Sequence, residues 1–141
     1  METGNRHATL VLVGDRGVLV TGPSGAGKSR LALDLIDNAA GFAMLVADDR
    51  VIVERRADGR YVGGAPGSIS GLIEMHGTGI VERRNEPRAV IDLVVEMVEE
   101  SAIDRMPERE NRDGIMSIRI PIRDCGAARQ HIAEALGRLN S

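Results

Sequence analysis

The sequence predicts an α/β fold of one domain, residues 1–141, built around a phosphate-binding loop with a mixed sheet, an extra β-hairpin and a C-terminal helix. Residues 22–29 read Gly-Pro-Ser-Gly-Ala-Gly-Lys-Ser, which is the spacing of glycines, Lys and Ser that defines such a loop. A β-branched segment, residues 17–21, precedes this glycine loop, and a helix-forming segment, residues 30–36, follows it. Strand, glycine loop and helix in this order are the context that the motif requires.

The glycine loop (residues 22–29) can turn its N–H groups around phosphate oxygens at the positive end of the following helix. Lys28 is the only lysine among 18 Lys and Arg residues, and an ammonium on a flexible stem suits a point contact to the β- and γ-phosphates. The Ser29 hydroxyl is predicted to hold Mg²⁺. We therefore predict a nucleotide site formed by Gly22, Pro23, Ser24, Gly25, Ala26, Gly27, Lys28 and Ser29.

The first half of the chain predicts a hairpin, a helix and a buried strand. Residues 7–13 form a strand, residues 14–17 form a turn, and the strand that enters the glycine loop is the second arm of this hairpin. A helix is expected over residues 29–38. Residues 42–47 are expected to form a short buried strand, parallel to the strand before the loop and next to it.

The second half is unusually rich in strands. Residues 50–56 and 60–63 predict a hairpin where most small phosphate-loop enzymes continue with a helix. Strands are also expected at residues 72–75, 89–97 and 115–122, with an exposed polar loop over 99–113. Residues 127–139 predict an amphipathic helix with Ile132, Ala135 and Leu136 facing inward. The total is seven or eight strands and two or three helices.

Asp48 and Asp49 end the strand that follows the loop helix, which is where open α/β sheets place ligand chemistry. One carboxylate is expected to support Mg²⁺, directly or through water, and the other to accept a proton from a hydroxyl. Glu74 and His76 alternate along a predicted strand and so point the same way, although a surface turn is the alternative. By its sequence position alone, His7 is a surface residue.

Composition excludes several partners. Phe42 and Tyr61 are the only aromatic residues, which disfavours stacking on single-stranded nucleic acid. A net charge of −3, with charges interspersed, attracts neither DNA nor an anionic membrane. The N-terminus does not resemble a signal peptide, no apolar run could span a bilayer, and the single cysteine, Cys125, fits a reducing compartment. We expect a cytoplasmic protein without nucleic-acid or membrane partners.

Four segments together resemble one known family. His7 opens a strand fifteen residues before Gly22, and residues 46–49 (Val-Ala-Asp-Asp) follow the loop helix. Residues 74–80 (Glu-Met-His-Gly-Thr-Gly-Ile) and 120–123 (Ile-Pro-Ile-Arg) are similar to two further signatures. Over nearly its whole length the chain resembles the C-terminal catalytic domain of HPr kinase/phosphorylase, and we expect a short form without the family's N-terminal domain.

The resemblance implies a fold related to phosphoenolpyruvate carboxykinase, assembly as hexamers, and modification of a serine on HPr, a phosphocarrier of the sugar phosphotransferase system. It implies that Asp49 accepts the serine proton, that His7 supports this acid–base site, and that Arg105 stabilises charge. The full set of expected catalytic residues is Asp49, His7, Lys28 and Arg105, and the expected Mg²⁺ ligands are Ser29, Glu74 and Asp48. His76 stands where the family usually has Arg. Residues 121–126 lack the second arginine of the corresponding family segment, which is tied to the phosphorylase reaction, so whether this chain also removes the phosphoryl group from HPr stays open.

Our leading hypothesis is an ATP- and Mg²⁺-dependent protein serine kinase acting on an HPr-type phosphocarrier. A small-molecule kinase of the shikimate or gluconate type is the first alternative, but it should continue into a helix where residues 50–63 predict a hairpin. The second alternative is a nucleotide-dependent switch whose loops order on the γ-phosphate. The sequence has no Asn-Lys-x-Asp element for reading guanine, so a usual GTPase is excluded.

Overall fold

The computed structural model of the 141-residue chain describes residues 1–66, 72–75, 79–82, 88–99, 109–122 and 125–139. Two helices and eleven strands occur in these residues. In chain order they are β1 (Gly4–Arg6), β2 (Ala8–Val13), β3 (Arg16–Thr21), α1 (Lys28–Asp37), β4 (Ala43–Ala47), β5 (Val51–Arg55), β6 (Tyr61–Gly64), β7 (Leu72–Met75), β8 (Gly79–Glu82), β9 (Arg88–Val98), β10 (Arg109–Arg112), β11 (Ile115–Pro121) and α3 (Cys125–Leu139).

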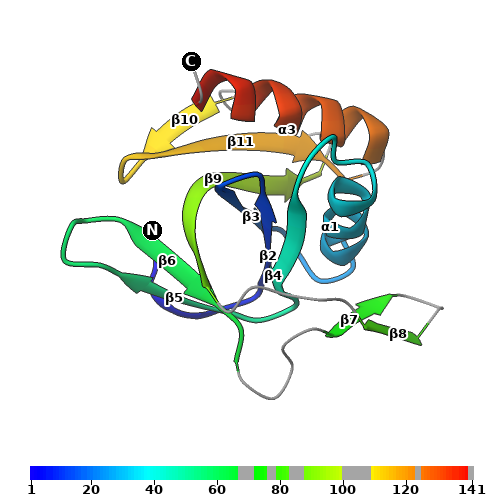
Figure 1. Cartoon of the computed structure of the whole chain (residues 1–141), viewed down its shortest axis with the longest axis horizontal. Helices are drawn as coiled ribbons and strands as arrows, with labels where there is room; N and C mark the ends of the chain where they lie inside the picture. The colour runs from blue at the N-terminus through cyan, green and yellow to red at the C-terminus, as the bar shows by residue number, and fades with distance from the viewer. Residues whose placement is uncertain (67–71, 76–78, 83–87, 100–108, 123–124, 140–141) are drawn as a thin grey trace.

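Nine strands form one curled, mixed sheet. Its main path is β1-β5-β6-β9-β3-β2-β4, while β11 also pairs with β9, and β10 pairs with β11. The long strand β9 joins the two halves: its first residues pair antiparallel with β6, and its later residues pair parallel with β3 and β11. Figure 1 shows β9 bending strongly between these two sets of partners. The antiparallel pair β7–β8 forms a separate small sheet beside the main body.

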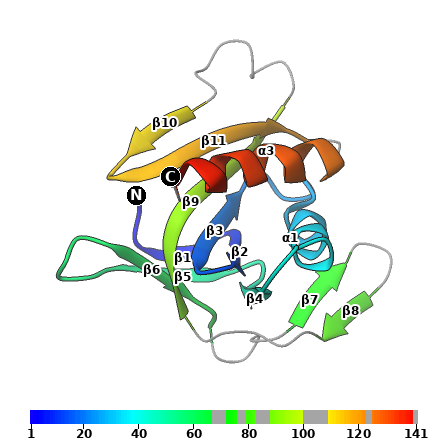
Figure 2. The same cartoon turned by 45° about the horizontal axis from the view of Figure 1, so that its top comes forward.

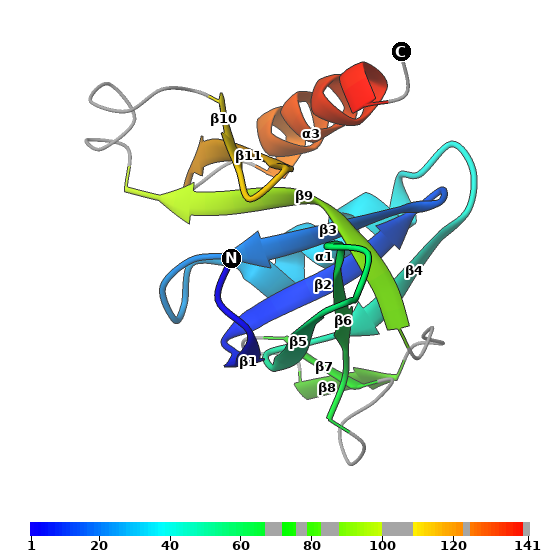
Figure 3. The ribbon, with the colours of Figure 1, turned by 90° about the vertical axis from the view of Figure 1, so that its left-hand side faces the viewer.

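The core lies on both faces of this sheet. Along β9 every second side chain is buried, as a pleated strand requires. One apolar cluster includes Val20, Val95 and Ile132 and fills the space between the sheet and the two helices. A second cluster, around Leu10, Leu19 and Val53, lies on the opposite face, where β5 and β6 cross over β2 and β3. Figures 2 and 3 show α1 and α3 on one side of the sheet and the β5–β6 hairpin on the other.

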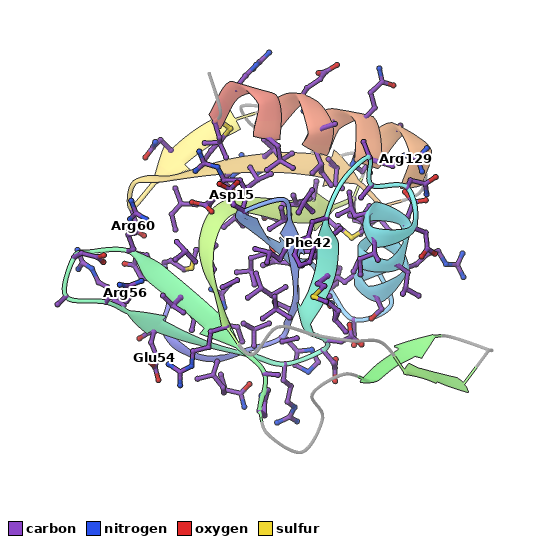
Figure 4. The ribbon with its side chains drawn as sticks, viewed as in Figure 1. Asp15, Phe42, Glu54, Arg56, Arg60 and Arg129 are labelled. Atoms are coloured by element: carbon purple, nitrogen blue, oxygen red, sulfur yellow. The ribbon has the colours of Figure 1, made fainter. Side chains whose placement is uncertain are left out.

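The two helices are also joined by charge. Nη1 of Arg129 on α3 donates to both carboxylate oxygens of Asp34 on α1, at 2.9 and 3.0 Å. Figure 4 labels Arg129 where α3 lies beside α1. The C-terminal helix is therefore fixed to the helix that follows the glycine loop by an ion pair as well as by its apolar face.

Most predicted elements are confirmed. The β2–β3 and β5–β6 hairpins, the loop helix and the last strand form where the sequence predicts them. Ile132, Ala135 and Leu136 are buried, as the amphipathic pattern of the terminal helix requires.

Three expectations about the strands are wrong. β4 does not lie next to β3, because β2 lies between them and pairs antiparallel with both; β3 and β4 do run in the same direction. Residues 109–112, predicted to belong to an exposed loop, form the edge strand β10 against β11. The eleven strands exceed the predicted seven or eight because β1, β8 and β10 are short segments without a clear apolar alternation.

Candidate active site

Three chain segments meet at one edge of the sheet because of the antiparallel position of β2. The register pairs Ala8 with Thr21 and Leu10 with Ala47. The start of β2, the end of β3 and the end of β4 therefore lie side by side. This brings His7, the glycine loop and the Asp48-Asp49 pair to the same edge.

The glycine loop packs tightly on the end of β9. A Cβ added to Gly22 would lie 3.0 Å from the Cβ of Met97 and 3.1 Å from its carbonyl oxygen, which is tighter than an ordinary contact, and the φ of 154° also favours glycine there. Gly27 has φ 96° and serves as the N-cap of α1, whose first hydrogen bond runs from Leu31 N to Gly27 O at 2.9 Å. The loop thus enters the helix through a left-handed residue and aims the helix N-terminus at the site.

Lys28 lies inside the curve of this loop. Its side chain is buried, and Nζ donates hydrogen bonds to the carbonyl oxygens of Gly22 at 2.9 Å and Pro23 at 3.1 Å. An ammonium has three donors and no acceptor, so it can exchange weak carbonyl partners for phosphate oxygens without moving the backbone. The position of Lys28 is consistent with the predicted anion site.

Asp48 is the buried member of the acidic pair. It is 4% exposed, and its Oδ1 accepts hydrogen bonds from Ser29 Oγ at 2.6 Å and from Thr9 Oγ1 at 2.9 Å. A buried carboxylate is costly without such donors. The contact joins the end of β4 to the first turn of α1 and places a carboxylate against the last hydroxyl of the glycine loop.

Asp49 is the exposed member and has an unusual backbone. Its φ is 66°, and the N–H of Arg50 donates to the carbonyl of Asp48 at 2.7 Å, which makes a γ-turn centred on a non-glycine residue. Such a conformation is strained, and strain of this kind is concentrated at functional sites. The side chain is 63% exposed, with Oδ1 3.6 Å from Nδ1 of His7, itself 62% exposed. The two neighbouring carboxylates therefore face different surroundings.

The residues at this edge fit a magnesium ion bound together with phosphate. Mg²⁺ prefers oxygen ligands and usually takes one or two protein groups plus phosphate oxygens and water. Ser29 and Asp48 supply oxygen atoms 2.6 Å apart beside the loop. Within the described part of the chain no group of three or more His, Cys, Asp or Glu residues could hold a metal by itself.

Glu74 belongs to β7, which contacts α1, but its side chain lies outside the described residues. Arg105 and His76 lie outside the described residues altogether. Sequence reasoning missed Thr9, which is completely buried and bonded to Asp48. The available signal was a hydroxyl in an otherwise apolar strand, residues 8–13, two positions after His7.

Comparison with known proteins identifies a family for this chain. The family model described as HPr Serine kinase C-terminal domain matches residues 1–130. HPr kinase/phosphorylase from Lactobacillus acidophilus is 36% identical over 125 residues, which cover 82% of this chain and 38% of that protein. The protein of the same name from Geobacter sulfurreducens is 31% identical over an alignment of 160 residues, covering 97% of this chain and 49% of that protein. The chain thus spans between about two fifths and a half of these relatives.

A solved structure shows the same fold. The structure described as the Hpr(Ser) kinase/phosphatase from Coxiella burnetii matches 99% of this chain and 100% of that chain, with a TM-score of 0.79 and 23% sequence identity. The mixed α/β architecture with a curled sheet and two helices is therefore shared. No helix in the described residues is long and apolar enough to cross a membrane. By its sequence match over residues 1–130, the chain belongs to the HPr kinase family as a C-terminal domain.

Proposed function

We propose that this chain is the catalytic domain of an ATP- and Mg²⁺-dependent protein serine kinase that acts in the cytoplasm on an HPr-type phosphocarrier of a phosphotransferase system. The names of the relatives support this assignment. The observation that carries it is the junction at the sheet edge: Asp48 is bonded to Ser29 at the end of the glycine loop, while Asp49 and His7 lie exposed beside it.

In this proposal the glycine loop and Lys28 hold the phosphates of the nucleotide, and Ser29 with Asp48 holds the metal. When bound, Mg²⁺ neutralises phosphate charge. Asp49 accepts the proton of the attacking serine hydroxyl, and His7 keeps that carboxylate in place across 3.6 Å. Glu74 completes the metal ligands, and Arg105 supplies further positive charge, as the family resemblance implies.

Exposure of the proposed base favours a protein substrate over a small metabolite. Asp49 and His7 are both more than 60% exposed, so a serine on the surface of another protein can reach them. A metabolite kinase instead encloses its substrate to exclude water. The β5–β6 hairpin, found where such kinases continue with a helix, adds to this preference.

A transfer assay tests the proposal. The chain is mixed with ATP, Mg²⁺ and an HPr homologue, and the homologue is analysed by intact-mass spectrometry for the gain of one phosphoryl group on serine. Asp49→Asn should lose transfer and keep nucleotide binding, whereas Lys28→Ala should lose both, because its buried ammonium holds the loop and the phosphates. Undiminished transfer by Asp49→Asn would remove the proposed base. A nucleotide-dependent conformational change without transfer would favour the switch.

Assembly as a hexamer, as the resemblance implies, is part of the proposal. It is measured independently of activity by analytical ultracentrifugation of the chain with and without nucleotide. A monomer at every concentration would contradict this part alone.

Removal of the phosphoryl group from HPr is a separate question. It is measured with phosphorylated HPr and inorganic phosphate, which reports directly on the phosphorylase reaction.

A further inference from the structure

We propose that Thr9 is a positioning residue for the metal half of this site: its buried hydroxyl fixes Asp48 so that Asp48 can orient Ser29 toward a magnesium ion. This inference rests on the proposed nucleotide function, since the ion is the one that accompanies the phosphates. It assigns a role to a residue that the motif around the glycine loop does not contain.

The topology explains why such a residue is needed. β4 is separated from the loop strand β3 by β2, so Asp48 must reach the loop across an intervening strand. Thr9 is the β2 residue at that point: it pairs with Val20 in β3, and its neighbour Leu10 pairs with Ala47 in β4. Thr9 therefore lies in β2 between the end of β3, which leads into the glycine loop, and the end of β4, which carries Asp48.

The chemistry of the contact indicates a role beyond packing. The other buried residues of β2 are apolar, and a hydroxyl buried among them is unfavourable unless it is hydrogen-bonded. Thr9 Oγ1 and Ser29 Oγ both donate to the same atom, Oδ1 of Asp48, at 2.9 and 2.6 Å. Among the described residues no hydrogen bond reaches Oδ2. Thr9 and Ser29 thus set the rotation of the carboxylate together.

The order of bonds defines how Thr9 acts. The Ser29 hydroxyl donates a hydrogen bond to Asp48, which leaves the lone pairs of Ser29 Oγ available to a cation. Asp48 is itself one of the groups proposed to hold the metal, and an outer partner that orients such a group typically contributes 10- to 100-fold to metal affinity. Thr9 is one bond further out than Asp48, and because it shares the same acceptor atom, its loss frees Asp48 to rotate away from Ser29.

The test compares Thr9→Val with Thr9→Ser in the full chain. Thr9→Val has nearly the same shape and no donor, and Thr9→Ser restores the donor. Binding of ADP is measured by isothermal titration calorimetry, first in EDTA and then at increasing Mg²⁺. In Thr9→Val we expect unchanged ADP affinity in EDTA and a Mg²⁺ requirement raised about 10-fold or more. Thr9→Ser should need the same Mg²⁺ as the wild type.

Two controls separate positioning from stability. Val11→Ala removes a buried side chain from the same strand without touching Asp48, so it should destabilise the fold and leave the Mg²⁺ requirement unchanged. Thr9→Cys keeps the volume with a weaker donor and replaces Thr9→Val if that variant does not fold; its requirement should lie above that of the wild type.

The possible outcomes are distinct. An unchanged Mg²⁺ requirement in Thr9→Val, or in Thr9→Cys where that variant is used, overturns the role of Thr9 and leaves the proposed kinase standing. An increase in Val11→Ala equal to that in Thr9→Val also overturns it, because the effect would then follow stability. A wild-type chain that binds no nucleotide with or without Mg²⁺ overturns the proposed function, and this inference with it.

Discussion

The contact between the glycine loop and β9 gives a sharp prediction for Gly22→Ala. The new Cβ would lie 3.0 Å from Met97 Cβ and 3.1 Å from Met97 O, and these atoms belong to the backbone or are rigidly attached to it. Overpacking of this kind costs about 1–3 kcal/mol. The backbone at Gly22 has φ 154°, where a non-glycine residue is strained by about 1–3 kcal/mol.

The two terms together predict that Gly22→Ala lowers the free energy of unfolding by about 2–6 kcal/mol. For a domain of this size the melting temperature should fall by roughly 6 °C or more. The measurement is urea unfolding followed by circular dichroism without ligand, together with ADP titration of the folded fraction. ADP binding should be lost as well, because any relief of the clash moves the loop that carries Lys28.

Gly41→Ala is the matched control. No heavy atom lies within 4 Å of a Cβ at that position. The same chemical change there should be neutral or stabilise by about 0.4–1 kcal/mol through the unfolded chain. Equal unfolding midpoints for Gly22→Ala and Gly41→Ala would refute the reasoning, because they would show that the loop does not press against β9.

Two further predictions concern Asp49 and the helix pair. Asp49→Gly should be more stable to urea than Asp49→Ala by about 1 kcal/mol, because alanine must adopt the positive φ of the γ-turn and the exposed pair with His7 contributes little; equal stability would argue against that turn. A double-mutant cycle of Asp34→Ala and Arg129→Ala should give a coupling free energy of about 1 kcal/mol in thermal unfolding, because the two side chains are only partly exposed. Added salt should reduce this coupling free energy, because both side chains still reach the solvent. Additive single effects would show that the apolar face alone fixes α3.

Local patterns predicted a large part of this molecule. The glycine loop, its flanking strand and helix, and the two hairpins depend on residues close together in the chain, where backbone freedom, turn chemistry and side-chain periodicity act directly. β10 was missed for the same reason: its residues, Arg-Glu-Asn-Arg, have no apolar alternation, and only β11 beside it makes them a strand.

The sequence by itself determined which chemical groups are available to the proposed site, because glycine spacing, Lys28, Ser29 and the acidic pair together predict phosphate chemistry. The tertiary structure alone decided how these groups are divided. It inserted β2 between β3 and β4, buried Asp48 against Thr9 and left Asp49 exposed beside His7. Strand order depends on pairing between residues far apart in the chain, which gives little local signal. The surroundings of two adjacent and chemically identical aspartates were therefore separated only by folding, whereas the different roles proposed for them were already implied by the family resemblance.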